Sequence, residues 1–167
     1  MRLTVFTDYT LRTLIYLALR PDTLVTISDV ATAYKISTNH LMKVVHQLAL
    51  SGDIITVRGQ RGGLRLARPA NEINIGAVVR RAEPDLELVP CFGSKTVCVI
   101  HPACVASIAV DEALRAFLAT LDRYTLADLV RTSPALAGLL QIKEPGAPNS
   151  PHLPEINDAD TRAAEVG

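Results

Sequence analysis

The order of hydrophobic patterns between residues 27 and 66 is the feature that most restricts the fold of this chain. Two segments with apolar residues at helical spacing, joined by a short turn at Lys35, are followed by two short β-prone runs. The tandem glycines Gly62 and Gly63 between those runs favour a tight hairpin. The expected elements are a helix over 27–34 capped near Ser28, a helix from Ser37 or Thr38 to Leu50, and strands over 54–58 and 64–66. Helix, turn, helix and hairpin in this order predict a winged helix-turn-helix domain, although such turns often place Gly where this chain has Lys35.

The rest of the chain adds helices and a tail to this domain. Further helices are expected at the N-terminus, with Thr7 or Asp8 as its cap, and over 73–81, 102–123, 126–131 and 133–140. Four prolines within ten residues after Lys143 predict a disordered tail. The fold is therefore expected to be mainly α-helical with a small β-hairpin. Its expected parts are a winged helix-turn-helix domain (1–82), a cysteine loop with a long helix (83–142) and the tail (143–167).

The two halves of the chain differ in charge, although the net charge is zero. Residues 1–81 carry 11 Lys and Arg against 5 Asp and Glu, a balance of +6, whereas residues 82–167 carry 6 against 12, a balance of −6. A basic N-terminal half can approach a phosphate backbone; the alternative is a chance clustering of charges on solvated faces. The chain shows no signal-peptide pattern and no run near the roughly 18 apolar residues of a membrane span. We therefore expect a cytoplasmic protein with no membrane contact.

The second helix of a helix-turn-helix motif enters the major groove of DNA, where its first turns face base edges. Asn39 can pair with adenine there, and Thr38 can contact a thymine methyl group, whereas Lys43 can reach phosphate. Long basic side chains at the tip of a hairpin suit a narrow minor groove. The expected DNA-binding residues are Ser37, Thr38, Asn39, His40 and Lys43 of the helix and Arg58, Gln60, Arg61 and Arg65 of the hairpin. Taken singly, each of them could be an ordinary exposed polar residue.

The long helix carries an apolar stripe that a small domain leaves uncovered. The members of this stripe recur at helical spacing, and they are Val110, Leu114, Phe117, Leu118 and Leu121. A partner subunit is the simplest cover for such a face, because DNA-binding proteins of this architecture usually act as two-fold dimers. Packing against the same chain is the alternative.

All three cysteines of the chain, Cys91, Cys98 and Cys104, lie in one segment with the spacing C-x6-C-x5-C. In a cytoplasmic protein, clustered thiolates more often bind metal or do redox work than form disulfides. Three thiolates leave a tetrahedral zinc ion or an iron–sulfur cluster one ligand short. The spacing lacks the C-x2-C pairs common in structural zinc sites, which favours a cluster. His101 and Asp8 are candidates for the fourth ligand. The alternative role of Asp8 is a structural one, because a carboxylate near a helix N-terminus stabilises the helix.

Five segments of the chain carry a more specific pattern. They are residues 3–12, 37–44, 57–63, 91–104 and 121–129. The first contains Thr-Asp8-Tyr, the third is the hairpin Val-Arg-Gly-Gln-Arg-Gly-Gly, and the fourth ends with His-Pro-Ala-Cys104. Together they resemble the family of iron–sulfur winged-helix transcription regulators, and in particular its nitric-oxide-sensing repressors. The resemblance runs from residue 1 to about residue 140.

This resemblance implies a homodimer with one iron–sulfur cluster per subunit, of the 4Fe-4S type or alternatively of the 2Fe-2S type. Cys91, Cys98 and Cys104 would ligate the cluster, and Asp8 of the other subunit would supply the fourth ligand. A sibling regulator of cluster assembly has His three residues after its last cysteine, where this chain has Ser107, which argues against the sibling. The six-residue gap after Cys91 is one residue longer than the gap expected in these relatives.

We therefore expect a transcriptional repressor rather than an enzyme. As a homodimer it would bind an AT-rich inverted repeat in double-stranded promoter DNA and release it when nitric oxide attacks the cluster. The alternatives are a regulator that responds to iron–sulfur or general redox state, a zinc-stabilised DNA-binding protein with no sensing role, and a thiol redox enzyme. The last would need an activated thiol with a nearby base, and the chain has no C-x-x-C motif.

Overall fold

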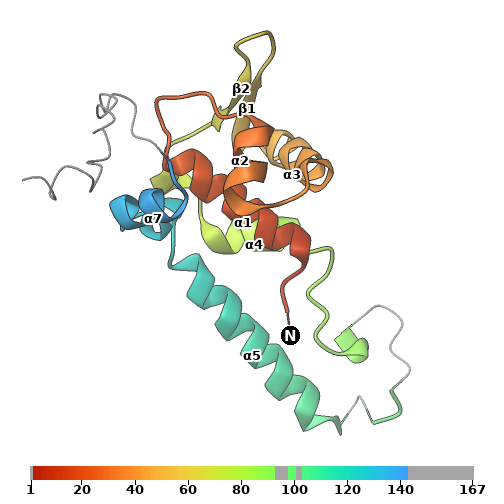
Figure 1. Cartoon of the computed structure of the whole chain (residues 1–167). Helices are drawn as coiled ribbons and strands as arrows, with labels where there is room; N and C mark the ends of the chain where they lie inside the picture. Colours follow the sequence, from red (N-terminus) through yellow and green to blue (C-terminus); the bar gives the residue numbers. More distant parts are fainter. Residues whose placement is uncertain (1, 93–97, 101–102, 143–167) are drawn as a thin grey trace, which may run out of the picture.

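A small β-hairpin and a long helix project from opposite ends of a helical body (Figure 1). The computed structural model describes residues 2–92, 98–100 and 103–142. Its elements are α1 (Val5–Ala18), α2 (Ile27–Tyr34), α3 (Thr38–Leu50), β1 (Ile54–Val57), β2 (Gly63–Leu66), η1 (Ala70–Glu72), α4 (Ile75–Ala82), η2 (Pro90–Phe92), α5 (Val105–Asp122), α6 (Leu126–Leu129) and α7 (Ser133–Leu139). The predicted fold class, mainly α with a two-stranded hairpin, is confirmed. The expected tail lies outside the described residues.

Helix α1 lies in the middle of the body, where it contacts α3, α4 and α6. Its N-cap is Thr4, whose hydroxyl accepts a hydrogen bond from the backbone N–H of Thr7 at 3.2 Å. The prediction that Thr7 or Asp8 caps this helix was wrong, because both lie inside it and Thr4 is the residue with an extended backbone. Two buried threonines further along α1 donate their hydroxyl protons to carbonyls four residues earlier, so that a polar helix can be buried without unpaired hydroxyls.

Helices α2 and α3 form the helix-turn-helix. A capping box between Thr26 and Asp29 begins α2, so the cap lies two residues before the expected Ser28. The helix ends at Lys35, whose φ of 54° is in the left-handed region where Gly is common, which explains why such turns favour Gly there. Helix α3 has the predicted bounds, and its buried face consists of the predicted residues Leu41, Val44, Val45 and Leu48.

Strands β1 and β2 pair in an antiparallel register in which Ile54 faces Leu66 and Val57 faces Gly63. Val25, which precedes α2, exchanges two backbone hydrogen bonds with Leu64 in β2, one through each N–H group. These bonds attach the hairpin to the helix-turn-helix. The predicted strands were correct to within one residue at each end, and the connection between them spans residues 58–62.

Helix α4 begins two residues later than expected, at Ile75, because Ile73 and Asn74 pair with the chain around Thr125 instead. Helix α5 follows the cysteine segment, and Cys104 is its N-cap, not a residue inside the helix as expected. The capping box of Thr125 and Asp128 that begins α6 is confirmed. Among the helices that the structure describes, none has both the length and the apolar character required to cross a membrane.

Candidate DNA-binding surface and cysteine segment

The N-terminal half of α3 presents its polar side chains to solvent. The five expected DNA-binding residues of this region, Ser37, Thr38, Asn39, His40 and Lys43, are all exposed. The buried residues of the same helix, Leu41, Val44, Val45 and Leu48, lie on its other side, against α1 and α2. The ring of His40 lies 6.1 Å from the ring of Tyr9 in α1, measured between centroids. The helix therefore offers a polar face suited to a groove, with its orientation fixed by packing.

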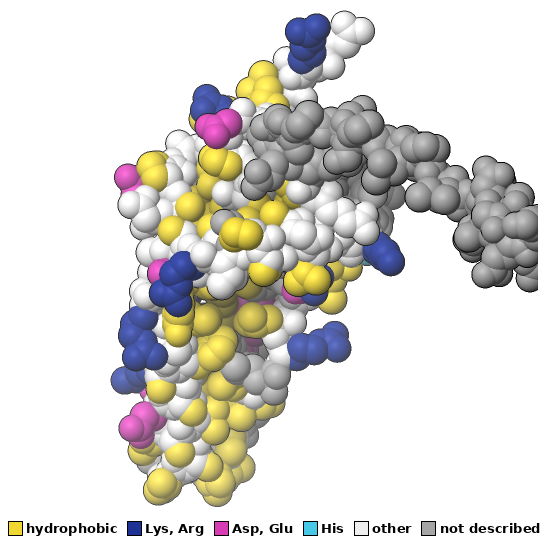
Figure 2. Space-filling model, turned by 60° about the vertical axis from the view of Figure 1, so that its left-hand side comes forward, with side chains coloured by type: hydrophobic (Ala, Val, Ile, Leu, Met, Phe, Trp, Pro, Cys, Tyr) yellow, Lys and Arg dark blue, Asp and Glu magenta, His cyan; other side chains and the backbone are white. Residues whose placement is uncertain are grey.

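The hairpin carries the basic residues expected at a wing. Arg58, Gln60 and Arg61 lie in the connection between the strands, Arg65 lies in β2, and all four are exposed. Figure 2 shows Lys and Arg side chains at the tip of the projecting hairpin. A positive, solvent-exposed tip of this kind can approach a phosphate backbone or enter a minor groove.

Two glycines give the wing tip its shape. Gly59 has a φ of 116°, which residues with a side chain rarely adopt. A Cβ atom at Gly62 would overlap the backbone carbonyl oxygen of Val57 and lie 2.9 Å from that of Gly59. The backbone N–H of Gly62 donates to the same Gly59 oxygen at 2.9 Å. The tip is therefore a tight backbone turn that tolerates no side chain at Gly62.

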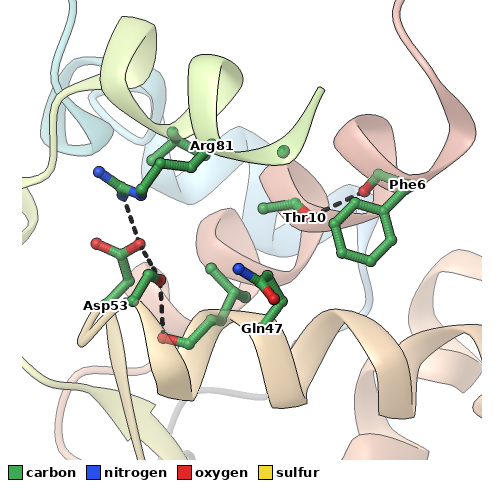
Figure 3. Close-up of a pocket in the computed structure, with 9 residues that line it drawn as sticks. Phe6, Thr10, Gln47, Asp53 and Arg81 are labelled. Atoms are coloured by element: carbon green, nitrogen blue, oxygen red, sulfur yellow. Dashed lines mark hydrogen bonds and ion pairs between the residues drawn. The ribbon is translucent and has the colours of Figure 1, made fainter. Parts of the chain in front are cut away.

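A buried carboxylate lies beneath this surface, and no sequence pattern indicates its partners. Asp53 is 1% exposed and accepts hydrogen bonds from Ser51 Oγ at 2.8 Å, Arg68 Nη2 at 2.5 Å and Arg81 Nη2 at 2.6 Å. Figure 3 shows Arg81 of α4 reaching Asp53 beside a small pocket that Phe6, Thr10 and Gln47 help to line.

The ionisation of this carboxylate depends on its partners. Burial acts to raise the pKa of Asp53, but the hydrogen bonds from Ser51 and Arg68 and the charge of Arg81 outweigh burial, so the pKa lies below its ordinary value. Asp53 is therefore a charged link between the end of α3, the hairpin and α4. A polar residue directly after a helix stop and before an apolar strand was the only signal in the sequence.

The three cysteines lie in the segment that leads into α5. Cys91 is half-buried in η2, Cys98 is exposed, and Cys104 is half-buried at the N-cap of α5. The hydroxyl of Ser107 donates to the carbonyl oxygen of Cys104 at 2.7 Å, which makes it a helix-terminus residue. His101 lies outside the described residues. Within the described ranges, no three His, Cys, Asp or Glu side chains gather closely enough to hold a metal ion.

Asp8 lies on α1 rather than in the cysteine segment. Its side chain is 46% exposed, and Nε of Arg12 lies 2.9 Å from both carboxylate oxygens. The hydrogen bond to Asp8 raises the pKa of Arg12. The Arg12 guanidinium also lies over the ring of Tyr34 in α2, 5.5 Å from its centroid. Asp8 is therefore open to solvent on one side and connected to α2 through Arg12 on the other.

A helix-turn-helix with an adjoining basic hairpin places this protein in the class of winged helix-turn-helix transcription regulators. Residues 3–132 match the model of the Rrf2 family, described as "Iron-dependent Transcriptional regulator", and the chain belongs to this family.

Individual relatives agree with this assignment. The chain is 49% identical over 145 residues to the "HTH-type transcriptional regulator NsrR" of Halalkalibacterium halodurans, covering 86% of this chain and 99% of the relative. It is 49% identical over 146 residues to the protein of the same name in Bacillus subtilis, covering 86% and 100%. The oxidized form of Staphylococcus aureus CymR has a similar structure, with a TM-score of 0.62, 27% identity, and coverage of 77% of this chain and 95% of that one. The predictions of a regulator rather than an enzyme, and of this family, are confirmed.

Proposed function

We propose that this protein represses transcription as a homodimer bound to an AT-rich inverted repeat, and that it senses nitric oxide through an iron–sulfur cluster. The observation that carries the proposal is the position of all three thiols on the segment between the winged-helix domain and α5, in a chain that belongs to a family of iron-dependent regulators. Because this segment joins the winged-helix domain to α5, a change in the ligands that its cysteines bind can alter the position of the domain relative to α5.

The residue types present fit such a cluster. Thiolates are its usual protein ligands, and Cys91, Cys98 and Cys104 would supply three. Asp8 of the partner subunit would supply the fourth, and the exposure of its carboxylate on α1 supports an approach from another chain. When bound, an iron–sulfur cluster supplies iron that nitric oxide can attack. The 4Fe-4S type is proposed, with 2Fe-2S as the alternative.

Residues next to Asp8 connect its helix to the DNA-binding surface. Arg12 pairs with Asp8 and lies over Tyr34 of α2, and Tyr9 contacts His40 of α3. The Asp8 carboxylate is either bound in the partner subunit or paired only with Arg12. The packing of α1 against α2 and α3 therefore differs between these two states. Operator affinity is sensitive to such shifts, because the DNA fixes the distance between two half-sites at about 34 Å or a multiple of it.

On the DNA side, Ser37, Thr38, Asn39, His40 and Lys43 would occupy the major groove, and Arg58, Gln60, Arg61 and Arg65 would contact phosphates or the minor groove. The exposure of all nine side chains supports this assignment. So does the packing of α3, whose four buried residues, Leu41, Val44, Val45 and Leu48, lie on the side away from them.

The central experiment is anaerobic purification followed by a visible spectrum, iron and sulfide assays, and DNA binding before and after stoichiometric nitric oxide. We expect a brown protein that binds an inverted-repeat operator and loses it on exposure to nitric oxide. Binding that persists at full strength after nitric oxide, or a colourless zinc-loaded protein that binds normally, would refute the proposal.

A pair of variants tests the ligand role of Asp8 against its role as an ion-pair partner. If Asp8 is a ligand, Asp8→Asn changes the visible spectrum and the nitric-oxide response, whereas Arg12→Gln, which removes the same ion pair, leaves the spectrum intact. Equal spectra for both variants would assign Asp8 to the ion pair alone. Cys98→Ala should abolish visible absorbance with helical content retained, and Ser107→Ala serves as its control because that hydroxyl donates its hydrogen bond to a backbone carbonyl.

A further inference from the structure

Helix α5 is attached to the body at its C-terminal end. It is 18 residues long, has no buried residue, and extends away from the winged-helix domain toward the cysteine segment (Figure 1). Figure 2 shows abundant hydrophobic side chains on the projecting part of the molecule. The contacts at its last turn therefore contribute to the direction in which α5 leaves the body.

Backbone hydrogen bonds fix the turn that follows α5. The N–H of Ile75 donates to the carbonyl oxygen of Tyr124 at 3.0 Å, and the N–H of Leu126 donates to that of Ile73 at 2.8 Å. Both bonds hold residues after the helix. They position the end of α5 without setting the angle at which the helix leaves.

Side chains of α4 and of its N-cap hold the last residue of α5 itself. Arg80 Nη1 and Nη2 donate to Asp122 Oδ1 and Oδ2, each at 2.6 Å, and Asn74 Nδ2 donates to the Asp122 carbonyl oxygen at 2.7 Å. The hydrogen bonds from Arg80 lower the pKa of Asp122, so the pair stays charged at neutral pH. Two parallel bonds between planar groups restrict orientation as well as distance.

Gly76 completes this arrangement. A Cβ atom there would overlap Oδ1 of Asp122 and lie 2.9 Å from its Cγ and 3.0 Å from Nη1 of Arg80. Because Gly76 lies inside α4, alanine would suit the helix better by about 1 kcal/mol. The missing side chain makes room for the carboxylate instead.

We propose that Asp122, Arg80, Asn74 and Gly76 form a clamp that sets the direction of α5 relative to α3, the recognition helix of the proposed DNA complex, and thereby the spacing between half-sites that the dimer accepts. The four are positioning residues, since none belongs to the proposed DNA-binding surface or ligand set. The inference rests on the proposed function, because it requires a dimer joined through α5 on an inverted repeat.

The length of α5 makes the angle important. A helix of 18 residues is about 27 Å long, so a swing of about 10° at one end displaces the other by about 5 Å. One base pair advances a half-site by about 3.4 Å, so a swing of that size is comparable with a change of spacing. Leu121 also packs against the core and supports the helix end, but an apolar contact fixes orientation less strictly than a bidentate ion pair.

The test measures spacing preference with the full-length, iron-loaded protein. An operator is selected from a random duplex library, and binding is then measured to the selected inverted repeat, to versions lengthened or shortened by one base pair between the half-sites, and to a single half-site. The variants are Arg80→Gln and Gly76→Ala. The control is Arg115→Gln, because Arg115 is an exposed residue whose ion pair, with Asp111, lies within α5.

We expect the wild-type protein and Arg115→Gln to lose about tenfold or more in affinity on altered spacings, and the two clamp variants to lose less than about threefold, with single-half-site affinity equal for all. Clamp variants that retain the wild-type spacing preference would overturn this inference alone. Failure of the iron-loaded protein to select any inverted repeat would overturn the proposed function, and with it the inference.

Discussion

Asp53 and Arg81 are 28 residues apart in the sequence, yet their carboxylate and guanidinium groups lie 2.6 Å apart. The backbone of Asp53 takes part as well. Its N–H donates to the carbonyl oxygen of Leu48 in α3, and its own carbonyl oxygen accepts from Ala67 just after β2, both at 3.0 Å. One residue therefore holds together the end of the recognition helix, the root of the wing and, through Arg81, helix α4.

Asp53→Ala should lower the free energy of unfolding by about 2–4 kcal/mol, because it removes three charge-assisted hydrogen bonds and leaves two guanidinium groups without their carboxylate. The loss is smaller than for a fully buried pair, since the Arg68 and Arg81 side chains remain 38% and 39% exposed and can be hydrated. Urea titration of the metal-free protein measures it. Asp22→Ala, at an exposed turn, is the control and should stay within about 0.5 kcal/mol of wild type; equal effects in both variants would contradict the role of Asp53.

The contribution of Asp53 should depend on pH in a defined direction. Its pKa is depressed in the folded state, so its stabilising effect is fully present above the unfolded value of about 3.9 and is lost as pH falls through the folded pKa. The difference in unfolding free energy between wild type and Asp53→Ala should be constant from about pH 7 to 5 and should shrink below about pH 4. A difference that grows on acidification would mean that the carboxylate is not held ionised by its partners.

The helix-turn-helix and wing could be predicted from sequence because their signals are local. Helix α3 has an apolar face at helical spacing and is followed by Gly52, whose φ of 72° requires a permissive residue. The start of α1 was missed because Thr4, Thr7 and Asp8 are all acceptable caps and propensity does not choose between them.

The site was only partly predictable, for a different physical reason. The exposed residues of α3 and of the wing follow from the motif. The partners of Asp53 and Asp122 are brought together by tertiary packing across 15 to 48 residues, which no periodicity encodes. The cysteine spacing indicates a chemistry but not the residue that another subunit adds to it, so Asp8 remains a proposal.

Gly62→Ala should weaken operator binding about tenfold or more, equivalent to about 1.4 kcal/mol, because the new Cβ would collide with backbone atoms and force the wing tip open. Gly52→Ala is a matched control. It places the same methyl group in open space at a left-handed residue, so it should cost about 1–2 kcal/mol of stability but leave DNA affinity unchanged. Fluorescence anisotropy with labelled operator and thermal unfolding separate the two effects, and a normal affinity for Gly62→Ala would exclude the wing tip from the interface.

Asn39 and Lys43 lie on the same exposed face of α3, one turn apart, and are proposed to contact different parts of DNA. Asn39→Ala should reduce discrimination at one base step by about 1–3 kcal/mol, because an amide that pairs with adenine carries sequence information. Its affinity for random duplex should change little. Titration against the selected operator and its single-base variants measures this, and equal losses on specific and random DNA would rule out base reading by Asn39.

Lys43→Ala should behave in the opposite way if its ammonium group neutralises a phosphate. Binding should weaken by a similar factor on operator and random duplex, and the slope of log affinity against log salt concentration should become shallower by about 0.9. The two variants thus serve as controls for each other, since they shorten neighbouring side chains of one helix without touching its buried face. If Lys43→Ala leaves the salt slope unchanged and lowers affinity only through one base pair of the operator, the Lys43 side chain contacts a base edge. The recognition helix would then be rotated from the orientation proposed here.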